Sequence, residues 1–196
     1  MRAVSPERAA EALRSGKVAL VPTETVVGLV AAESGLSRVR EIKGRDADKP
    51  IALLCRSAQE AFKLAANVPP LADKLADLYW PGPLTLVLDL PDGNTIGLRV
   101  PAGEAVRDLL GAYDSPLYAT SANVSGEPAR ATPEEVNPLV LKAVDIVVSG
   151  GKGSGEASAV VDLSRGKVEL LRADNQLSTE KLARLASEWG DKTESV

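Results

Sequence analysis

The sequence predicts an α/β fold of the α+β kind: a single domain with a twisted mixed β-sheet, flanking helices and a central cleft. Short apolar runs alternate along the chain with amphipathic stretches that begin at helix-capping residues. The 196 residues are 44% hydrophobic and 3% aromatic, which predicts an aliphatic core of the size of one ordinary domain. One pair of strands is separated by only a short turn, so antiparallel neighbours accompany the parallel ones.

Helices are predicted from their start and stop signals. Ser5-Pro6 begins the first, which stops at Gly16, and apolar residues recur every three positions in the second, from Leu36 to about Gly44. The remaining helices begin after a capping box at Ser57 and Glu60, at Pro69-Pro70, at Glu104, after a capping box at Thr132 and Glu135, and at Ser178. The helix that begins at Glu104 is expected to end at Leu110, before Gly111.

Strands are predicted wherever an apolar run is bounded by turn residues. Asp92-Gly93 is a turn that makes a hairpin of the runs on either side of it. The expected strands cover residues 17–21, 26–31, 50–55, 85–90, 95–100, 117–120, 145–148, 158–163 and 168–172. We expect residues 1–190 to form the domain and residues 191–196 to be a flexible tail.

The composition excludes several kinds of chemistry. The chain has no histidine, which rules out a Ser-His-Asp triad, a Cys-His dyad and a histidine-ligated zinc. Cys55 is the only cysteine, so no internal disulfide forms, and burial explains it better than catalysis. The net charge of −4 gives no basic field for nucleic acid. With no apolar leader or span, the protein is expected to be cytoplasmic and not to contact a membrane.

A polar segment, Pro22-Thr23-Glu24-Thr25, separates two runs that have the character of buried strands. Buried hydroxyls and carboxylates cost stability unless they are paired, so we expect a ligand or a defined partner here. Glu24 and Asp162 are the carboxylates best placed to bind a metal or an amine. Each could instead accept a backbone N–H.

Three cations, Lys43, Arg45 and Lys49, lie within seven residues of the segment IKGRDADKP. The spacing alone favours a structural explanation, in which Lys43 lies in the last turn of a helix before a Gly44 cap and the other two are solvated. The alternative is a polyanion site, where Arg provides forked contacts and Lys a point charge to phosphates.

Two loops offer small polar groups. TSANVSG, residues 120–126, directly follows an apolar run and fits either a turn or a set of hydrogen-bonding groups for a ligand. GGKGSG, residues 150–155, lacks the Lys-Ser/Thr pair and the following helix of a phosphate loop, so we expect residues 149–158 to be a mobile loop that acts as a lid. Arg99 and Arg172 lie in predicted strands, where each is either an outward-facing edge residue or part of a site.

In their order along the chain, these segments resemble the YrdC-like family of threonylcarbamoyl-AMP synthases. The likeness runs from about residue 18 to residue 172 through VPTETVVGL, IKGRDADKPIALL, WPGPLTLVL, GLRVP, TSANVSGEPA, VDIVVSGG and SAVVDL. Its most specific element is a Lys-x-Arg pair with a distant Ser-x-Asn, here Lys43, Arg45, Ser121 and Asn123. The chain resembles the short form of the family, without an additional C-terminal domain.

The resemblance implies a YrdC-like fold and a nucleotidyltransferase activity. Members of the family condense L-threonine, bicarbonate or CO₂, and ATP to threonylcarbamoyl-AMP and pyrophosphate. The product serves the N6-threonylcarbamoyladenosine modification of tRNA. The implied partners are therefore ATP with Mg²⁺, L-threonine, bicarbonate and the downstream proteins that transfer the threonylcarbamoyl group to tRNA.

The resemblance also assigns roles to individual residues. The implied catalytic group is Lys43, Arg45, Ser121 and Asn123. The implied ATP contacts are Arg45, Lys49, Thr95, Ser121, Ala129 and Arg172, and no protein ligand to a metal is expected. The implied threonine contacts are Thr25, Arg99, Ala119 through its backbone, and Ser158.

The implied reaction needs alignment and cations more than a strong base, because an amine adds to CO₂ and a carbamate oxygen then attacks the α-phosphorus. The lack of histidine is therefore no obstacle. The hydroxyls of residues 22–25 would pair with a substrate, and Mg²⁺ would be held by ATP and water.

The sequence departs from the family pattern at several positions. Val27 stands where a tyrosine is common, which would loosen the threonine pocket, and Asp46, Leu54, Ala129 and Ala159 also differ. Two other functions stay open. One is a YrdC-like paralogue that binds a nucleotide, or double-stranded RNA weakly, with little synthase activity; the other is a relative that uses a different amino acid. RNA binding requires an open basic concavity made by Lys43, Arg45, Lys49, Arg99 and Arg172.

Overall fold

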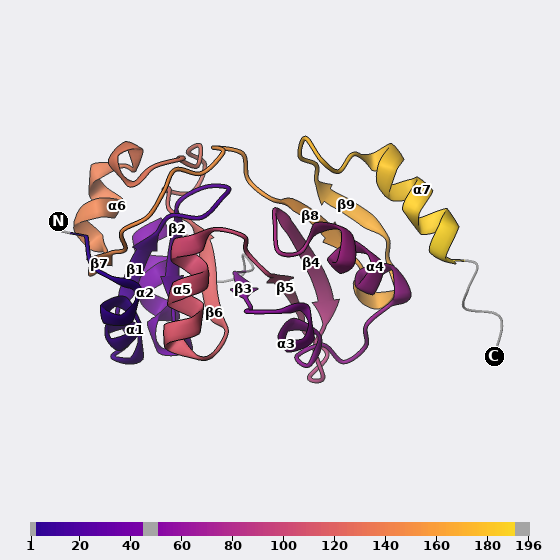
Figure 1. Ribbon diagram of the computed structural model, residues 1–196, viewed down its shortest axis with the longest axis horizontal. Helices are drawn as coiled ribbons and strands as arrows, with labels where there is room; N and C mark the ends of the chain where they lie inside the picture. Colours follow the sequence, from indigo (N-terminus) through magenta and orange to yellow (C-terminus); the bar gives the residue numbers. More distant parts are fainter. Residues whose placement is uncertain (1–2, 45–50, 191–196) are drawn as a thin grey trace.

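Nine strands form one mixed sheet in the computed structural model, which describes residues 3–44 and 51–190 (Figure 1). The strand order is β7-β1-β2-β6-β3-β5-β4-β8-β9, with parallel pairing at β7–β1, β3–β5 and β4–β8 and antiparallel pairing elsewhere. The strands are β1 (Val18–Val21), β2 (Gly28–Ala31), β3 (Ala52–Leu54), β4 (Leu84–Asp89), β5 (Thr95–Arg99), β6 (Leu117–Ser121), β7 (Ile146–Val147), β8 (Ala159–Asp162) and β9 (Glu169–Arg172).

Seven α-helices among the described residues flank this sheet. They are α1 (Pro6–Arg14), α2 (Leu36–Lys43), α3 (Ala58–Phe62), α4 (Pro70–Tyr79), α5 (Glu104–Tyr113), α6 (Pro138–Ala143) and α7 (Thr179–Gly190). The predicted architecture, a twisted mixed sheet with flanking helices, is therefore confirmed.

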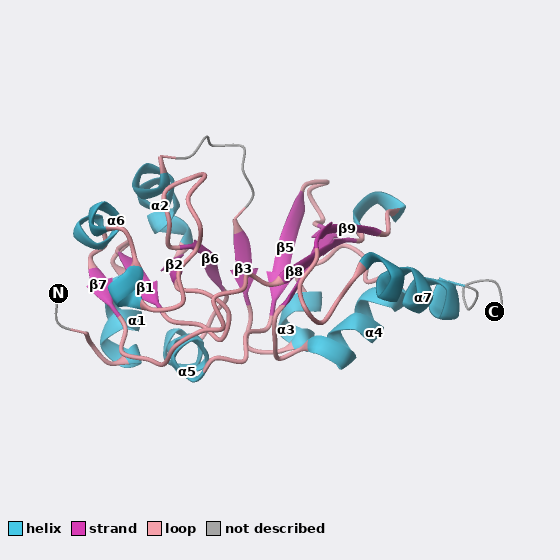
Figure 2. Cartoon of the chain, turned by 90° about the horizontal axis from the view of Figure 1, so that it is seen from above, coloured by secondary structure: helices cyan, strands magenta, loops and turns pink. Residues whose placement is uncertain are grey.

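Four strands, β7, β1, β2 and β6, form a half of the sheet that has helices on both faces, and we call it the covered half. Figure 2 shows α1 and α5 on one side of these strands and α2 and α6 on the other. Every residue of β1 and β2 is buried for this reason. Leu20 and Leu29 pack toward α2 and α6, whereas Val21 and Val30 pack toward α1 and α5. Continuous apolar runs such as VALV are typical of strands buried on both faces.

The strands β5, β4, β8 and β9 form the other half, which we call the open half; β3 joins the two. The helices of the described part pack on one face only, where α3, α4 and α7 cover Leu86, Leu98 and Val161 (Figure 2). The opposite face carries Thr85 and Arg99 among its residues, because side chains alternate along a strand. We call this the polar face.

Local predictions met with different results. The hairpin is confirmed: β4 and β5 pair antiparallel, and Gly93 in the turn has φ of 83°. The caps are also confirmed at Ser57, which accepts from the Glu60 N–H, and at Ser178, which accepts from the Lys181 N–H.

Two helix boundaries were predicted wrongly. The capping box at Thr132 leads only into a short 3₁₀ turn, and the helix begins at Pro138, where Asn137 accepts from the Leu139 N–H at 2.9 Å. Glu135 instead accepts from the Ala131 N–H at 3.2 Å. Helix α5 continues past Gly111, because burial of its apolar face against α1 outweighs the weak helix preference of one glycine.

Within the described ranges, no helix has the length and apolar character needed to cross a membrane.

Candidate functional site

Lys43 lies at the end of α2 and is only 3% exposed. Its Nζ donates to the Ser121 carbonyl at 2.5 Å and to Asn123 Oδ1 at 3.0 Å. The Ser121 hydroxyl donates to the same Asn123 oxygen at 2.5 Å. Asn123 in turn donates to the carbonyls of residues 124 and 127, which turns its Oδ1 toward the cation. We call these three residues the lysine cluster.

The position of Lys43 agrees with the structural explanation of the segment IKGRDADKP, and its contacts with distant polar residues are what a binding site would also need. Lys43 does occupy the last helical turn before Gly44, which has φ of 55°, and a cation is favourable at that end of a helix. Its ammonium group is buried and hydrogen-bonded across the sheet end. The loop of residues 120–126 is likewise a turn whose polar groups converge on one cation. Arg45 and Lys49 lie outside the described residues.

Arg99 is 8% exposed and belongs to β5, which lies between β3 and β4, so an outward-facing edge position is wrong for it. Its Nη2 donates to Glu24 Oε1 at 2.6 Å and to Thr25 Oγ1 at 3.0 Å, and its Nε donates to the Gly82 carbonyl at 3.1 Å. We call Arg99, Glu24 and Thr25 the arginine cluster. It fixes the polar segment of residues 22–25 against the end of β5.

The hydroxyls of the polar segment have partners within the protein. Thr23 Oγ1 donates to the Val26 carbonyl at 2.6 Å and lies 2.9 Å from Thr25 Oγ1. It also accepts from the Thr25 N–H at 3.2 Å. These bonds satisfy the buried polar groups whose presence in the sequence suggested a ligand or a partner.

Each of the two singled-out carboxylates accepts a backbone N–H. Glu24 Oε2 accepts from Gly103 N at 2.9 Å, and Asp162 Oδ1 accepts from Ser164 N at 2.9 Å. Burial opposes ionisation of Glu24, but the Arg99 charge and backbone N–H groups outweigh it, so the pKa of Glu24 is lowered. The Asp162 carboxylate also accepts from the Ser164 hydroxyl and lies 3.5 Å from Lys167 Nζ.

Arg172 lies on β9, the outer strand of the open half, and bonds to a neighbouring site residue. Its Nε donates to the Ser158 carbonyl at 2.7 Å, and its Nη2 lies 3.3 Å from Ser158 Oγ. Ser158 Oγ is also 3.0 Å from Thr85 Oγ1. Partial burial and the charge of Arg99 lower the pKa of the Arg172 guanidinium, while Asp174 opposes them. Two cations therefore share this part of the polar face.

The strand register places most of the predicted residues at two levels of one sheet face. Arg99 is level with Leu54 of β3, which is level with Leu117 of β6. Thr95 on β5 and Ser121 on β6 form a second level, four residues from the level of Arg99 and Leu117. At about 3.3 Å per residue, the two levels are roughly 13 Å apart.

The first of these levels continues across the open half. The register there runs from Arg99 through Thr85 and Val160 to Arg172. The lysine cluster, whose Lys43 comes from α2 on the opposite face, lies with Thr95 at one end of these strands, and the cations Arg99 and Arg172 lie at the other end.

Two predicted residues stand apart from these groups. Ala119 is paired with Val30 on one side and Ala52 on the other, so its backbone groups are directed at neighbouring strands. Ala129 is half-buried in the loop before Arg130. Val27, the departure from the family pattern, is fully buried in the apolar core toward α2 and α6.

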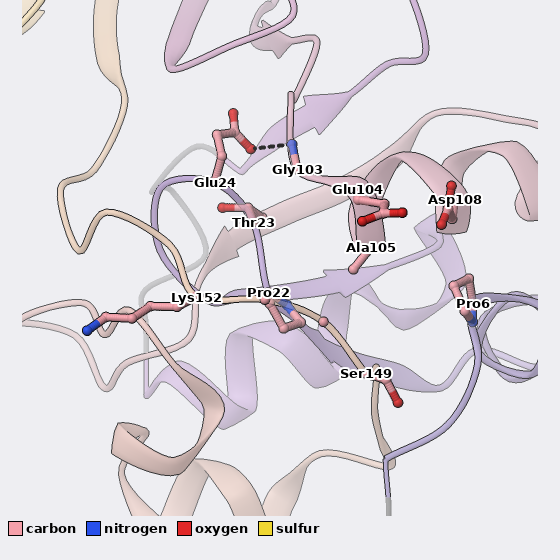
Figure 3. A pocket seen from close by; sticks show the side chains of 12 residues that line it. Pro6, Pro22, Thr23, Glu24, Gly103, Glu104, Ala105, Asp108, Ser149 and Lys152 are labelled. Carbon is pink, nitrogen blue, oxygen red and sulfur yellow. Dashed lines mark hydrogen bonds between the residues drawn. The ribbon is translucent and has the colours of Figure 1, made fainter.

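Neither of two surface hollows contains the whole predicted set. The larger, of about 300 Å³, lies between α1, the start of α5 and residues 149–152 (Figure 3). Thr23 and Glu24 reach it, as do Glu104, Asp108 and Lys152. The second, of about 270 Å³, is lined by Asn123 and by several residues of the loop that follows it, Glu127, Pro128, Arg130, Glu135, Asn137 and Pro138 among them. The central cleft that the sequence predicted therefore stays a prediction.

The glycine-rich loop lies against the polar segment. Its N–H groups at Gly153, Ser154 and Gly155 donate to the carbonyls of residues 131, 24 and 25 at 2.8–3.0 Å. The loop therefore holds the backbone that carries Thr25. Its role as a lid stays a prediction.

The other chemical groups give little support to a further reaction centre. Burial raises the pKa of the Cys55 thiol to about 12, as suits an inert core residue. No three Asp, Glu or Cys side chains in the part of the chain described here gather closely enough to hold a metal ion.

Sequence reasoning missed Thr85 and Gly82 as parts of the site. Thr85 binds Ser158, and the Gly82 carbonyl binds Arg99. The signal for Thr85 was present, because it is a hydroxyl at the start of an apolar strand run. The contact of Gly82 depends on the chain path and has no signature in the sequence.

Comparisons with known proteins identify relatives of this chain. A family model for Sua5, YciO and YrdC, described as "Telomere recombination", matches residues 11–174. A threonylcarbamoyl-AMP synthase from Pyrococcus abyssi is 36% identical over 177 residues, which cover 84% of this chain and 52% of the relative. The chain therefore spans about half the length of that relative.

Solved structures give the same result. The crystal structure of P. abyssi Sua5 complexed with L-threonine superposes with a TM-score of 0.82 at 32% identity, over 94% of this chain and 58% of that one. The structure of E. coli YciO superposes with a TM-score of 0.76 at 26% identity and covers 85% of this chain and 87% of its own.

Proposed function

Since the chain belongs to the Sua5/YciO/YrdC family, we propose that it is an L-threonylcarbamoyladenylate synthase. The reaction joins L-threonine, bicarbonate or CO₂, and ATP, and it yields threonylcarbamoyl-AMP and pyrophosphate. The product would pass to proteins that transfer the threonylcarbamoyl group to an adenosine of tRNA. A curated relative that carries the synthase name and a related structure that contains L-threonine support this proposal.

The observation that carries the proposal is the placement of cations at both ends of strands β5 and β6. At one end, Lys43 is held by Ser121 and Asn123; at the other, Arg99 and Arg172 lie close enough for their charges to interact. A triphosphate and an amino-acid carboxylate both need cations, and a face about 13 Å long has room for the two side by side.

We assign the residues of this face to the two substrates. The lysine cluster and Thr95 would contact ATP with Arg45 and Lys49, and Arg172 and Ala129 would contact it from the other side. Arg99, Thr25 and Ser158 would hold L-threonine, whereas the backbone of Ala119 is directed at neighbouring strands and is left out of this assignment. Arg99 supports this division best, because its Nη1 has no hydrogen-bond partner within the described ranges and so is available to a carboxylate.

Each residue would act by position and charge. Arg99 would hold the carboxylate of threonine so that its amine can add to CO₂, and the resulting carbamate oxygen would attack the α-phosphorus as pyrophosphate leaves. Lys43 would offset the negative charge that develops on the phosphate oxygens. Mg²⁺ fits this donor set only as a companion of ATP, because the residues involved are cations and hydroxyls; it would shield the triphosphate charge.

The burial of Lys43 and Arg99 favours a small-molecule site over an RNA surface, although Arg172 is exposed. Lys43 is 3% exposed and Arg99 is 8% exposed, and both donate hydrogen bonds within the protein. An RNA backbone needs cations that protrude from the surface. We therefore rank RNA binding second to synthase activity as a candidate function.

The test is a reconstituted reaction. The protein is incubated with ATP, Mg²⁺, bicarbonate and one amino acid at a time, and pyrophosphate and the adenylate are followed by mass spectrometry. Release of pyrophosphate that depends on both threonine and bicarbonate supports the proposal. Release with another amino acid would reassign the substrate, and ATP binding without release would contradict synthase activity.

A further inference from the structure

Glu24 has a set of contacts that only a carboxylate of its length can make. One oxygen accepts from Arg99 Nη2 at 2.6 Å, and the other accepts from Gly103 N at 2.9 Å. Figure 3 shows the second of these bonds, at the start of α5. A glutamine has one acceptor and one donor group in place of the two oxygens, so it would set its NH₂ against one of two N–H donors.

The same side chain determines which part of Arg99 is available. Nε is bound by the Gly82 carbonyl, and Nη2 is shared between Glu24 and Thr25. Nη1 has no hydrogen-bond partner among the described residues. The arginine side chain is long and flexible. The position of Nη1 is therefore fixed only while Nε and Nη2 are held by their hydrogen bonds.

Glu24 also lies where several segments of the chain meet. Its carboxylate joins the end of β5 to the start of α5, and its carbonyl accepts from Ser154 N of the glycine-rich loop at 2.9 Å. The side chain is partly buried, with 21% of it exposed, so solvent screens the ion pair only in part.

We infer that Glu24 is the positioning residue for the amino-acid substrate: it orients Arg99 so that Nη1 meets the substrate carboxylate. This rests on the proposed function for the identity of the substrate. Glu24 does not touch the reacting atoms and acts only through Arg99. A ligand without a carboxylate gains nothing from this arrangement, so the effect of Glu24 is specific to the amino-acid side of the site.

The experiment measures binding, which does not depend on turnover. L-threonine and its alcohol analogue L-threoninol are titrated by calorimetry into the wild type and into Glu24→Gln, with Mg²⁺ and a non-hydrolysable ATP analogue present. We expect Glu24→Gln to raise the Kd for L-threonine at least tenfold. We expect the Kd for L-threoninol and that for the ATP analogue to change less than twofold.

Two further variants separate positioning from loss of structure. Glu104→Gln removes a carboxylate from the same hollow next to Gly103, without a contact to Arg99, and should leave every Kd unchanged. In the background of Arg99→Met, the additional change Glu24→Gln should not weaken threonine binding further, because Glu24 acts only through the guanidinium that Arg99→Met removes.

The outcomes separate this inference from the proposed function. Equal losses of affinity for L-threonine and L-threoninol would overturn the positioning role. Losses of threonine affinity that add up in the double variant would overturn it as well. A wild type that binds no amino acid would also overturn it. A wild type that binds L-threonine but releases no pyrophosphate would refute the synthase proposal and leave the role of Glu24 to be judged by the affinities.

Discussion

The two halves of the sheet differ in how many of their faces are buried, and this difference locates the chemistry. In the covered half, β1 and β2 are buried at every residue. In the open half, buried leucines of β4 such as Leu86 alternate with residues of the polar face such as Thr85, Val87 and Asp89. The polar side chains that bind one another across strands lie on that second face or at its border with the covered half.

The comparison shows what each half contributes. The covered half anchors the polar segment and the lysine cluster, since both follow strands that cannot shift without disturbing two apolar layers. The open half carries Arg99, Ser158 and Arg172 on a face that no helix of the described part covers. One half therefore provides rigidity, and the other provides the binding groups.

The largest expected effect tests the packing side of this comparison. Leu29→Ala removes a fully buried side chain from the covered half and should lower the free energy of unfolding by about 3–4 kcal/mol. Leu171→Ala, at a residue that is 54% exposed in β9, should cost less than about 1 kcal/mol. Chemical denaturation measures both. Equal losses would mean that the two halves are packed alike.

The next effect tests the lysine cluster as a catalytic element. Lys43→Met keeps the length of the side chain but removes the charge, and we expect pyrophosphate release to slow at least 100-fold, or about 2.7 kcal/mol. Unfolding free energy should change by less, because exchanging a buried charge for an apolar group is often tolerated. Lys142→Met, on the exposed surface of α6, is the control. A normal rate in Lys43→Met would remove the cluster from the reaction.

A smaller effect is expected where the open half meets the nucleotide. Arg172→Lys cannot keep the forked contacts to the Ser158 carbonyl and hydroxyl, so the Kd for ATP should rise about tenfold, or about 1.4 kcal/mol. Fluorescence titration with a labelled ATP analogue measures the change. Arg184→Lys on α7 serves as the matched control, and an unchanged affinity in Arg172→Lys would move the nucleotide away from β9.

The smallest expected effect is on thermal stability at low pH. The pKa of Glu24 is lowered in the folded state, so its contribution to stability is present above the ordinary glutamate pKa of about 4.3 and is lost as pH falls through the folded pKa. Thermal unfolding midpoints between pH 7 and pH 3.5 should therefore fall less steeply for Glu24→Gln than for wild type. Glu104→Gln should follow the wild-type curve; if Glu24→Gln did so too, the Arg99 pair would not stabilise the fold.

The sequence predicted the elements well because most of them depend on local signals. Gly16 and Gly44 at helix ends, the Asp92-Gly93 turn and Ser57 act through bonds to near neighbours, and each is found where expected. Thr132 failed because the competing signal, Asn137 before Pro138, is equally local and has the better geometry. Local signals alone could not decide between the two.

The site was harder to predict because its contacts join distant segments. The hydrogen bond of Lys43 to Ser121 spans 78 positions, and that of Arg99 to Glu24 spans 75. Spacing in the sequence favoured a structural role for Lys43 in the last turn of a helix, and only the family resemblance grouped it with Ser121 and Asn123. The partners of Thr23 and Thr25 lie within the protein, whereas the sequence suggested that a substrate would take them.

From its composition, the glycine-rich loop would be taken for a spacer into which a tag could be inserted. In the structure it is instead a segment that packs closely against its neighbour. A methyl group at Gly153 would come within 2.3 Å of the Thr25 carbonyl oxygen, so the missing side chain is what lets two backbones touch. Replacing this run with a serine- or alanine-based linker of equal length would therefore force the glycine-rich loop away from the backbone that carries Thr25.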